Sequence, residues 1–273
     1  MRRKALGREL RKLRTQAGES LEEIAKLLGC STGKVGHFET GRNAPSKPEL
    51  MVLLNHYNIS AQDQAVYEEI RQEASKRGWW STYRLPNWFS NYVGMETDAL
   101  RLRNFELELI PGLLQTEEYA RAVTVLARHM TEPTEVERKV ELRMARQKRL
   151  FAEEPLEQIA VISEAALHRC VKTKDVSARQ LTHLLEMGER PNIEIHILPF
   201  DDGLHASLSG SFALLDFPSE TWPPAAYQEY AVGGHLVDDL EIVAALDTLF
   251  GELRERALSE RDSARLISKL VHK

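Results

Sequence analysis

The chain has 273 residues, of which 42% are apolar and 28% are charged, and its formal net charge is −5. No stretch approaches the roughly 18–20 apolar residues of a membrane span, and the opening Met-Arg-Arg-Lys leads into an amphipathic helical pattern instead of the apolar core of a signal peptide. The two cysteines, Cys30 and Cys170, form no Cys-x-x-Cys arrangement, which argues against a disulfide framework and a cysteine-based zinc site. We expect a cytoplasmic protein without membrane contact, metal or cofactor.

Positive charge is concentrated near the amino end. Residues 1–60 carry 11 Lys and Arg against 6 Asp and Glu, a balance of +5; the whole-chain totals of 36 and 41 then leave 25 against 35, or −10, for residues 61–273. Such a basic patch attracts phosphate through counterion release, although an ordinary solvated face would carry the same charges. The basic residues of the first predicted helix are Arg2, Arg3, Lys4, Arg8, Arg11 and Lys12.

Residues 18–42 predict two short helices joined by a tight turn. Ser20 can accept a hydrogen bond from the Glu23 backbone N–H while the Glu23 carboxylate reaches back, a capping box that starts a helix at about Leu21. Gly29 tolerates the left-handed conformation of a helix C-cap and ends this helix. The apolar stripe at helical spacing consists of Leu21, Ile24, Ala25 and Leu28.

A second helix, over residues 31–40, begins at Ser31, which can cap it, and turns Val35 and Phe38 inward. Its opposite side faces solvent and is the candidate surface for reading DNA. A helical hairpin without this function would show the same caps and stripe, and two glycines in the helix interior weaken the helix. The outward residues are Thr32, Gly33, Lys34, Gly36 and His37.

Residues 5–58 resemble the helix-turn-helix domain of the xenobiotic-response-element family of regulators, which includes phage repressors. The resemblance implies a structural ion pair between Arg14 and Glu39. It also implies base contacts from Thr32, Gly33 and His37, and contacts to the DNA backbone from Ser20, Leu21, Lys34, Arg42 and Asn43. The matching elements are Leu10-Arg11-Lys12-Leu13-Arg14, Ile24-Ala25, Val35, and Phe38-Glu39-Thr40-Gly41-Arg42-Asn43-Ala44-Pro45-Ser46.

The chain departs from the commoner pattern of that family at Gly33 and Gly36, where longer polar or basic side chains are usual. We therefore expect little direct readout of bases at these positions. Specificity would rest on Thr32, on His37 and on DNA shape.

Two further helices, at 47–57 and 61–76, complete an all-α head of five helices, and the composition changes abruptly after Gly78. We place a helix-turn-helix DNA-binding domain at 1–77 and a partner- or ligand-sensing domain at 78–273. The second domain opens with a dense group of aromatic residues, which is either a buried hinge or a wall around a ligand or partner. This group consists of Trp79, Trp80, Tyr83, Trp88, Phe89 and Tyr92.

The second domain is predicted to make the protein α+β, with a mixed sheet of about four strands and flanking helices mainly on one face. Strands are expected at 158–163, 193–198, 211–217 and 225–231. Helices are expected at 99–107, 117–130, 135–151, 175–189, 239–257 and 260–271. The helix at 135–151 carries a basic run that predicts a solvated, ion-paired face: Arg138, Lys139, Arg143, Arg146, Lys148 and Arg149.

This domain also resembles the C-terminal domain of WhiJ-like regulators of actinobacteria. The segments that carry the resemblance include Gly78-Trp79-Trp80, Tyr92-Val93-Gly94-Met95-Glu96 and Ile197-Leu198-Pro199-Phe200. Members of that family resemble the antitoxins of toxin–antitoxin pairs and are often encoded beside a small partner protein. The resemblance implies transcriptional control through a partner protein or a small-molecule effector, and we expect repression.

We expect a homodimer on double-stranded DNA, because two heads on a twofold axis can read half-sites about 34 Å apart. The chain has no His-Glu-x-x-His, Gly-x-x-x-x-Gly-Lys or Gly-x-Ser-x-Gly motif, so we expect no enzyme. The alternatives are an antitoxin-like protein that mainly binds a small partner, with DNA binding for autoregulation, and an enzyme with a DNA-binding appendage. One apolar stripe on the helix predicted at 239–257 is either the surface that pairs in a dimer or part of the core of the chain. It consists of Leu240, Val243, Leu246, Phe250 and Leu253.

Overall fold

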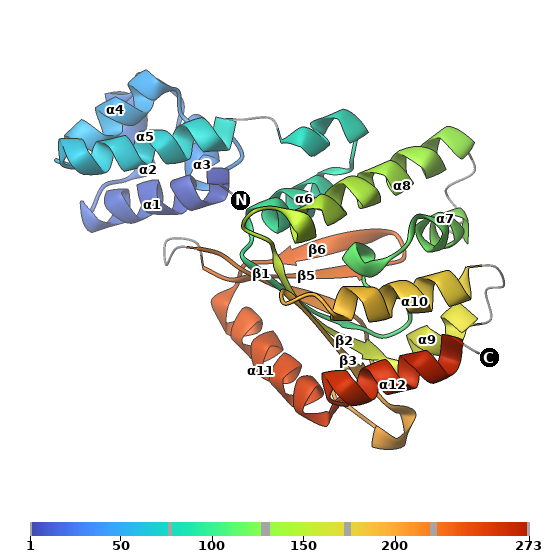
Figure 1. The fold of residues 1–273 in the computed structure, drawn as a ribbon. Helices are drawn as coiled ribbons and strands as arrows, with labels where there is room; N and C mark the ends of the chain where they lie inside the picture. The colour runs from blue at the N-terminus through green and yellow to red at the C-terminus, as the bar shows by residue number, and fades with distance from the viewer. Residues whose placement is uncertain (1, 76–77, 127–131, 172–175, 219–222, 272–273) are drawn as a thin grey trace. The chain divides into compact units, whose positions relative to one another are not determined.

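The structure, a computed structural model, describes residues 2–75, 78–126, 132–171, 176–218 and 223–271. The chain forms two compact units, Met1–Trp79 and Trp80–Lys273 (Figure 1). The domain boundary drawn from the sequence lies two residues earlier, after residue 77. None of the helices in the described ranges combines the length and the apolar character that a bilayer crossing requires.

The described residues of the N-terminal unit form five helices, the number that the sequence predicts. Four of them begin after a serine whose hydroxyl accepts a hydrogen bond from a backbone N–H of the first turn; these serines are Ser20, Ser31, Ser46 and Ser60. The five helices are α1 (Arg2–Gln16), α2 (Leu21–Leu27), α3 (Thr32–Glu39), α4 (Lys47–His56) and α5 (Ala61–Ser75).

The core of the N-terminal unit forms where the apolar sides of its helices meet. α3 contributes Val35 and Phe38, each only 2% exposed, so one side of this short helix is held in the core. The rest of α3 is thereby presented outward in a fixed orientation. The buried cluster consists of Leu6, Leu10, Ile24, Ala25, Val35, Phe38, Leu50, Leu53 and Leu54.

Within the part of the C-terminal unit that the structure describes, six strands form one mixed sheet in the order β3-β2-β1-β4-β5-β6. β1 and β2 pair in parallel, as do β2 and β3, whereas β4 pairs antiparallel with β1 and the β4–β5 and β5–β6 pairs are antiparallel too. The strands are β1 (Arg101–Glu106), β2 (Glu157–Ser163), β3 (Ile193–Leu198), β4 (Phe212–Asp216), β5 (Ala225–Tyr230) and β6 (Gly233–Val237).

Helices cover both faces of the sheet. Figure 1 shows α11 on one side and α6, α7, α8 and α10 on the other, so most helices share one face, as expected. The helices are α6 (Asn87–Asp98), α7 (Glu117–Leu126), α8 (Pro133–Gln147), α9 (Glu164–Val171), α10 (Ser177–Gly188), α11 (Leu240–Arg256) and α12 (Glu260–Val271), with short 3-10 helices η1 (Trp79–Tyr83), η2 (Gly112–Leu114), η3 (Lys148–Phe151) and η4 (Phe200–Asp202).

The helix predicted at 99–107 is wrong, because this segment contains β1. β1 lies inside the sheet, paired with β2 on one side and with β4 on the other, and both partners come from distant parts of the chain. β6 raises the number of strands to six and was missed because it opens with two glycines, which disfavour strands. A Cβ at Gly234 would lie 2.4 Å from the Tyr227 hydroxyl oxygen, so close packing requires glycine there.

Most of the stripe on α11 belongs to the core, although Leu240 at its start is 57% exposed. Val243, Phe250 and Leu253 are 3%, 2% and 1% exposed and pack in one cluster with the sheet residues Phe105 and Leu214. Core packing therefore accounts for most of the stripe, and Leu240 is the one exposed residue of the five.

Candidate nucleic-acid interface

α2 begins at a complete capping box. The Ser20 N–H donates to Glu23 Oε2 at 2.7 Å, and the Glu23 N–H donates to Ser20 Oγ at 3.2 Å. These bonds from Ser20 hold the pKa of the Glu23 carboxyl below its usual value. The amide of Ser20, one of the expected contacts to the DNA backbone, is thus engaged by Glu23, while Leu21 occupies the first position of the helix.

A Schellman motif ends α2 and sets the angle of the turn. The Cys30 N–H donates to the Ala25 carbonyl at 2.9 Å, and the Gly29 N–H donates to the Lys26 carbonyl at 3.2 Å. Gly29 has φ +61°, a conformation that glycine adopts without steric cost. α3 starts two residues after Cys30, so α2, the turn and α3 form a helix-turn-helix unit.

α3 divides into a buried side and a solvent side. Ser31 Oγ accepts from the Lys34 N–H at 3.3 Å and caps the helix, and Val35 and Phe38 are buried. Two of the three expected base contacts, Thr32 and Gly33, are exposed, and the third, His37, is partly buried. A Cβ at Gly33 or Gly36 would meet no atom within 4 Å, so the solvent side of α3 is open at both glycines.

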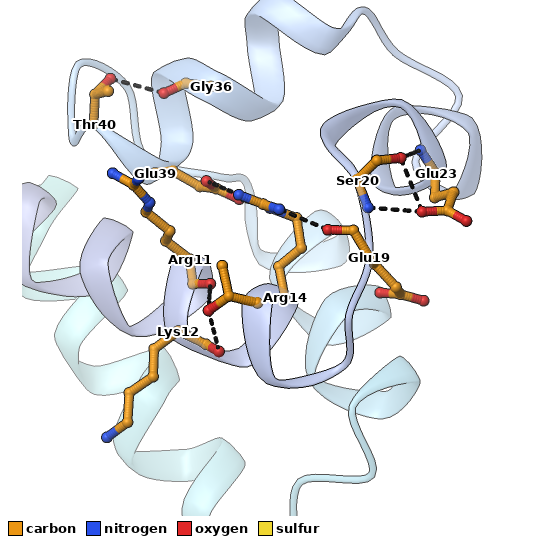
Figure 2. A network of polar contacts seen from close by, with 10 residues as sticks. Arg11, Lys12, Arg14, Glu19, Ser20, Glu23, Gly36, Glu39 and Thr40 are labelled. Carbon is orange, nitrogen blue, oxygen red and sulfur yellow. Dashed lines mark hydrogen bonds and ion pairs between the residues drawn. The ribbon is translucent and has the colours of Figure 1, made fainter.

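The ion pair expected between Arg14 and Glu39 is present and holds α1 to the end of α3 (Figure 2). Arg14 Nε and Nη2 donate to the two oxygens of Glu39 at 2.6 and 3.0 Å, a bidentate geometry, and this bonding raises the pKa of Arg14. Arg14 Nη1 also donates to the Glu19 carbonyl at 2.6 Å. One side chain therefore joins α1, the segment before α2, and α3; the bond to Glu19 was not foreseen, because it goes to a backbone atom.

α1 and α3 also touch at Gly7, a residue that no sequence pattern singled out. A Cβ at this position would lie 2.4 Å from the Phe38 carbonyl oxygen and 2.6 Å from the Glu39 carbonyl oxygen. Glycine therefore permits the backbone of α1 to approach the last turn of α3, and this contact fixes where the end of α3 lies.

Lys34, expected to contact the DNA backbone, is held by α4. Lys34 Nζ lies 2.5 Å from Glu49 Oε1 and 5.7 Å from the centre of the Phe38 ring. The bond to Glu49 raises the pKa of Lys34; burial raises the pKa of Glu49, but bonds from Lys34 and Ser46 outweigh it and lower that pKa. Ser46 and Glu49 form a capping box, so the sequence could place Glu49 at the start of α4, but it could not reveal Lys34 as its partner.

Arg42 and Asn43 lie beside His37 at the end of α3. Arg42 Nη1 is 3.5 Å from His37 Nε2, and the Asn43 N–H donates to the His37 carbonyl at 3.1 Å. Because a guanidinium group only donates, His37 Nε2 is the acceptor in this contact. The structure therefore brings three of the expected DNA-contacting residues together at one end of the exposed side of α3.

The aromatic segment begins with rings of different exposure. Trp79 is 40% exposed, and Tyr83 is partly buried. Trp80 Nε1 donates to Ser90 Oγ at 3.2 Å, and its ring packs so closely on α6 that a Cβ at Gly94 would lie 2.8 Å from it. Trp80 is therefore packed against its own unit.

The rest of the aromatic segment lies on α6 and contacts the sheet. Tyr92 is 7% exposed and stacks on Tyr227 of β5 with ring centres 4.1 Å apart, while Phe89 lies 6.0 Å from Tyr92 and 5.5 Å from Trp88. Burial is the main cause that raises the pKa of Tyr92. These rings help to join α6 to the sheet.

Phe89 and Tyr92 lie beside a buried ion pair between Arg146 of α8 and Glu96 of α6. The sequence had instead predicted a solvated basic face for this part of α8. Arg146 Nε and Nη2 donate to the Glu96 carboxylate at 2.7 and 2.6 Å, and both side chains are at most 6% exposed. The guanidinium carbon lies 5.4 Å from the ring centres of Phe89 and Tyr92. The prediction of a solvated face is wrong for Arg146, because its carboxylate partner comes from α6 and not from α8 itself.

Comparison with known families divides the chain at the same region as the fold. Residues 5–66 match the family model described as a helix-turn-helix domain, in agreement with the geometry of α2, the turn and α3. Residues 89–269 match the family model described as a domain of unknown function, DUF5753. Comparisons with curated proteins and with solved structures gave no significant match.

Proposed function

The chain belongs to the DUF5753 family and carries a helix-turn-helix domain before the matched region, and on this premise we propose that it is a DNA-binding transcriptional repressor. The observation that carries the proposal is the division of α3: Val35 and Phe38 are buried, while Thr32, Gly33 and Lys34 are exposed. A short helix held in this way can enter the major groove, which is wide enough for it. The basic charge of residues 1–60 supports attraction to the phosphates.

We propose that Thr32, Gly33 and His37 contact bases and that the surrounding groups contact the DNA backbone. Ser20 and Leu21 at the start of α2, and Arg42 and Asn43 after α3, are proposed for the backbone, together with Lys34 once it leaves Glu49. The resemblance to xenobiotic-response-element regulators supports these assignments. The Arg14–Glu39 pair is proposed as a structural support that holds α3 at its angle.

We propose that a partner protein or small ligand bound to the C-terminal domain controls DNA binding, as the resemblance to WhiJ-like regulators implies. A homodimer is proposed, because two copies of α3 would read two half-sites. The cytoplasm is the proposed location, because chromosomal DNA is the proposed partner. The protein would act by binding and not by catalysis.

The alternative, an antitoxin-like protein that mainly binds a small partner, is favoured by one observation. The turn between β5 and β6 exposes Tyr230 and Val232, which are 58% and 87% exposed. Purification of the chain together with the products of its neighbouring genes would test this alternative. A stoichiometric complex that persists when DNA binding is abolished would support it.

The experiment for the main proposal measures binding of the full chain to genomic fragments over a series of salt concentrations. We expect salt-sensitive binding with preference for particular fragments. His37→Ala should weaken binding to the preferred fragment by roughly 5- to 150-fold, the usual range for a base contact, and lessen the preference. Gln62→Ala, an exposed change on α5, serves as the control. Absence of salt-sensitive binding to any fragment would overturn the proposal.

A further inference from the structure

Glu194, His196 and Glu260 converge at the outer edge of the sheet in the C-terminal unit. Glu194 and His196 are two residues apart on β3 and so lie on the same face of the strand, while Glu260 is the first residue of α12. One ligand atom from each of the three side chains lies within 4.8 Å of the other two. We propose that this cluster binds one divalent transition-metal ion and that zinc is the ion that fits it best.

The backbone holds the three residues together. The Ile197 N–H of β3 donates to Ser263 Oγ of α12 at 2.9 Å, and the Leu258 N–H donates to the Ile197 carbonyl at 2.9 Å. The connection between α11 and α12 therefore runs along the edge of β3 and places Glu260 beside His196. A site built on a strand and a helix start, joined by hydrogen bonds, is positioned before any ion arrives.

The orientation of His196 is the second observation that points to a cation. Its Nδ1 lies 3.0 Å from the Leu258 carbonyl oxygen, and because a carbonyl only accepts, Nδ1 carries the ring hydrogen. In the neutral ring, Nε2 is then an acceptor, yet it lies 3.3 Å from Glu194 Oε2, which is also an acceptor. His196 is only 9% exposed, so these two facing acceptors need either a hydrogen on Nε2 or a metal ion between them.

A metal ion satisfies this requirement in the usual geometry of a metal-bound histidine. Histidine ligands typically donate their second ring N–H to a backbone carbonyl or carboxylate, which aims the other nitrogen at the metal, as the Leu258 carbonyl does here. One imidazole nitrogen and two carboxylate oxygens are ligands that zinc accepts at about 2.0–2.2 Å, and a water would complete four-coordination. Calcium and magnesium favour sites made only of oxygen.

The neighbouring charges are compatible with a bound cation. Arg254 Nη2 contacts Glu194 Oε2, the same oxygen that faces His196 Nε2, so the arginine orients the Glu194 carboxylate beside the site. With a neutral imidazole, Glu194, Glu260 and Arg254 together carry a charge of −1. A divalent ion would therefore bind to a site with net negative charge.

The test is titration of chelator-treated, tag-free full-length protein with zinc chloride by calorimetry, in a Cys30→Ala background that removes the partly exposed thiol. We expect one zinc per chain. His196→Asn retains an N–H that can donate to Leu258, and Glu260→Gln changes an exposed side chain, so both variants should fold. Each should bind zinc at least tenfold more weakly.

The controls remove one histidine and one glutamate elsewhere on the same unit. His235→Asn on β6 and Glu252→Gln on α11 are exposed changes and should leave the zinc affinity unchanged. X-ray absorption at the zinc edge should show one nitrogen and two carboxylate oxygens from the protein. Absence of stoichiometric zinc, or affinity unchanged in both His196→Asn and Glu260→Gln, would overturn the proposal and leave a proton on His196 as the positive charge. Neither result bears on DNA binding.

Discussion

Two glycines of the N-terminal unit, Gly7 and Gly36, have different structural roles. A Cβ at Gly7 would collide with two carbonyl oxygens of α3, whereas a Cβ at Gly36 would meet no atom within 4 Å. Gly7 is therefore required by the packing of α1 on α3. Gly36 is not required by the fold, and its absence of side chain leaves the solvent side of α3 flat.

We predict that Gly7→Ala destabilises the N-terminal unit by about 1–3 kcal/mol, the usual cost of overpacking, because α1 must move away from α3. Gly36→Ala should instead stabilise α3 by roughly 0.5–1 kcal/mol. Hydrogen exchange of peptides from α1 and α3 in the full chain measures both changes. Equal protection in Gly7→Ala and the wild type would show that α1 does not press on α3.

Glu106 lies at the end of β1 and is only partly exposed. Burial raises the pKa of its carboxyl from 4.5 to about 7, and the nearby Glu229 adds to this rise, while Ser211, Asn104 and Arg143 oppose it. A folded-state pKa above the unfolded value means that the folded chain holds this proton more tightly. Ionisation of Glu106 therefore works against folding.

We predict that the free energy of unfolding of the C-terminal unit falls by roughly 2 kcal/mol through Glu106 alone as the pH rises from about 4.5 to 7. Above pH 7 this decline should end. Urea unfolding followed by tryptophan fluorescence, at pH 5.0 and 7.5, measures it. Glu106→Gln cannot ionise, so the difference between wild type and variant isolates the contribution; parallel pH profiles would contradict the prediction.

α3 and α4 are joined by Lys34 and Glu49, and this contact opposes the proposed role of Lys34. A lysine bound to a carboxylate must leave it before it binds a phosphate. The position of α4 therefore weakens the affinity of α3 for DNA under our proposal.

We predict that Glu49→Gln raises the affinity for DNA several-fold and steepens its salt dependence by about one phosphate contact, because Lys34 is released. Glutamine can still form the capping box with Ser46, so α4 should remain intact. Binding titrations at several salt concentrations measure both effects. Asp63→Asn at the start of α5 removes one negative charge elsewhere, and an equal effect there would show that general charge, not Lys34, is responsible.

The proposed regulator needs two copies of α3 if it reads two half-sites. Most of the apolar stripe of α11 packs within the chain, and Leu240 is the one exposed residue of the five, so this stripe alone offers little apolar surface to a dimer. We predict that light scattering gives about twice the chain mass of 31.1 kDa. A monomer both free and bound to DNA would contradict the homodimer and leave recognition to a single α3.

The helix-turn-helix could be predicted from the sequence because its signals are local. The capping boxes at Ser20 and Ser46, the cap at Ser31 and the glycine turn at Gly29 each act over three to six residues, and all are found in the structure. The helical spacing of the sequence also predicted which residues of α3 face the core and which face solvent. The Arg14–Glu39 pair was foreseen only through resemblance to a family.

The tertiary structure alone decided the features that depend on distant partners. β1 became a strand because β2 and β4 flank it, and Arg146 is buried because Glu96 reaches it from α6. Lys34 meets Glu49, and Glu260 joins β3, for the same reason. Caps and helical faces arise from interactions within one or two turns, whereas strand partners, buried ion pairs and convergent ligands depend on how separate segments fold together.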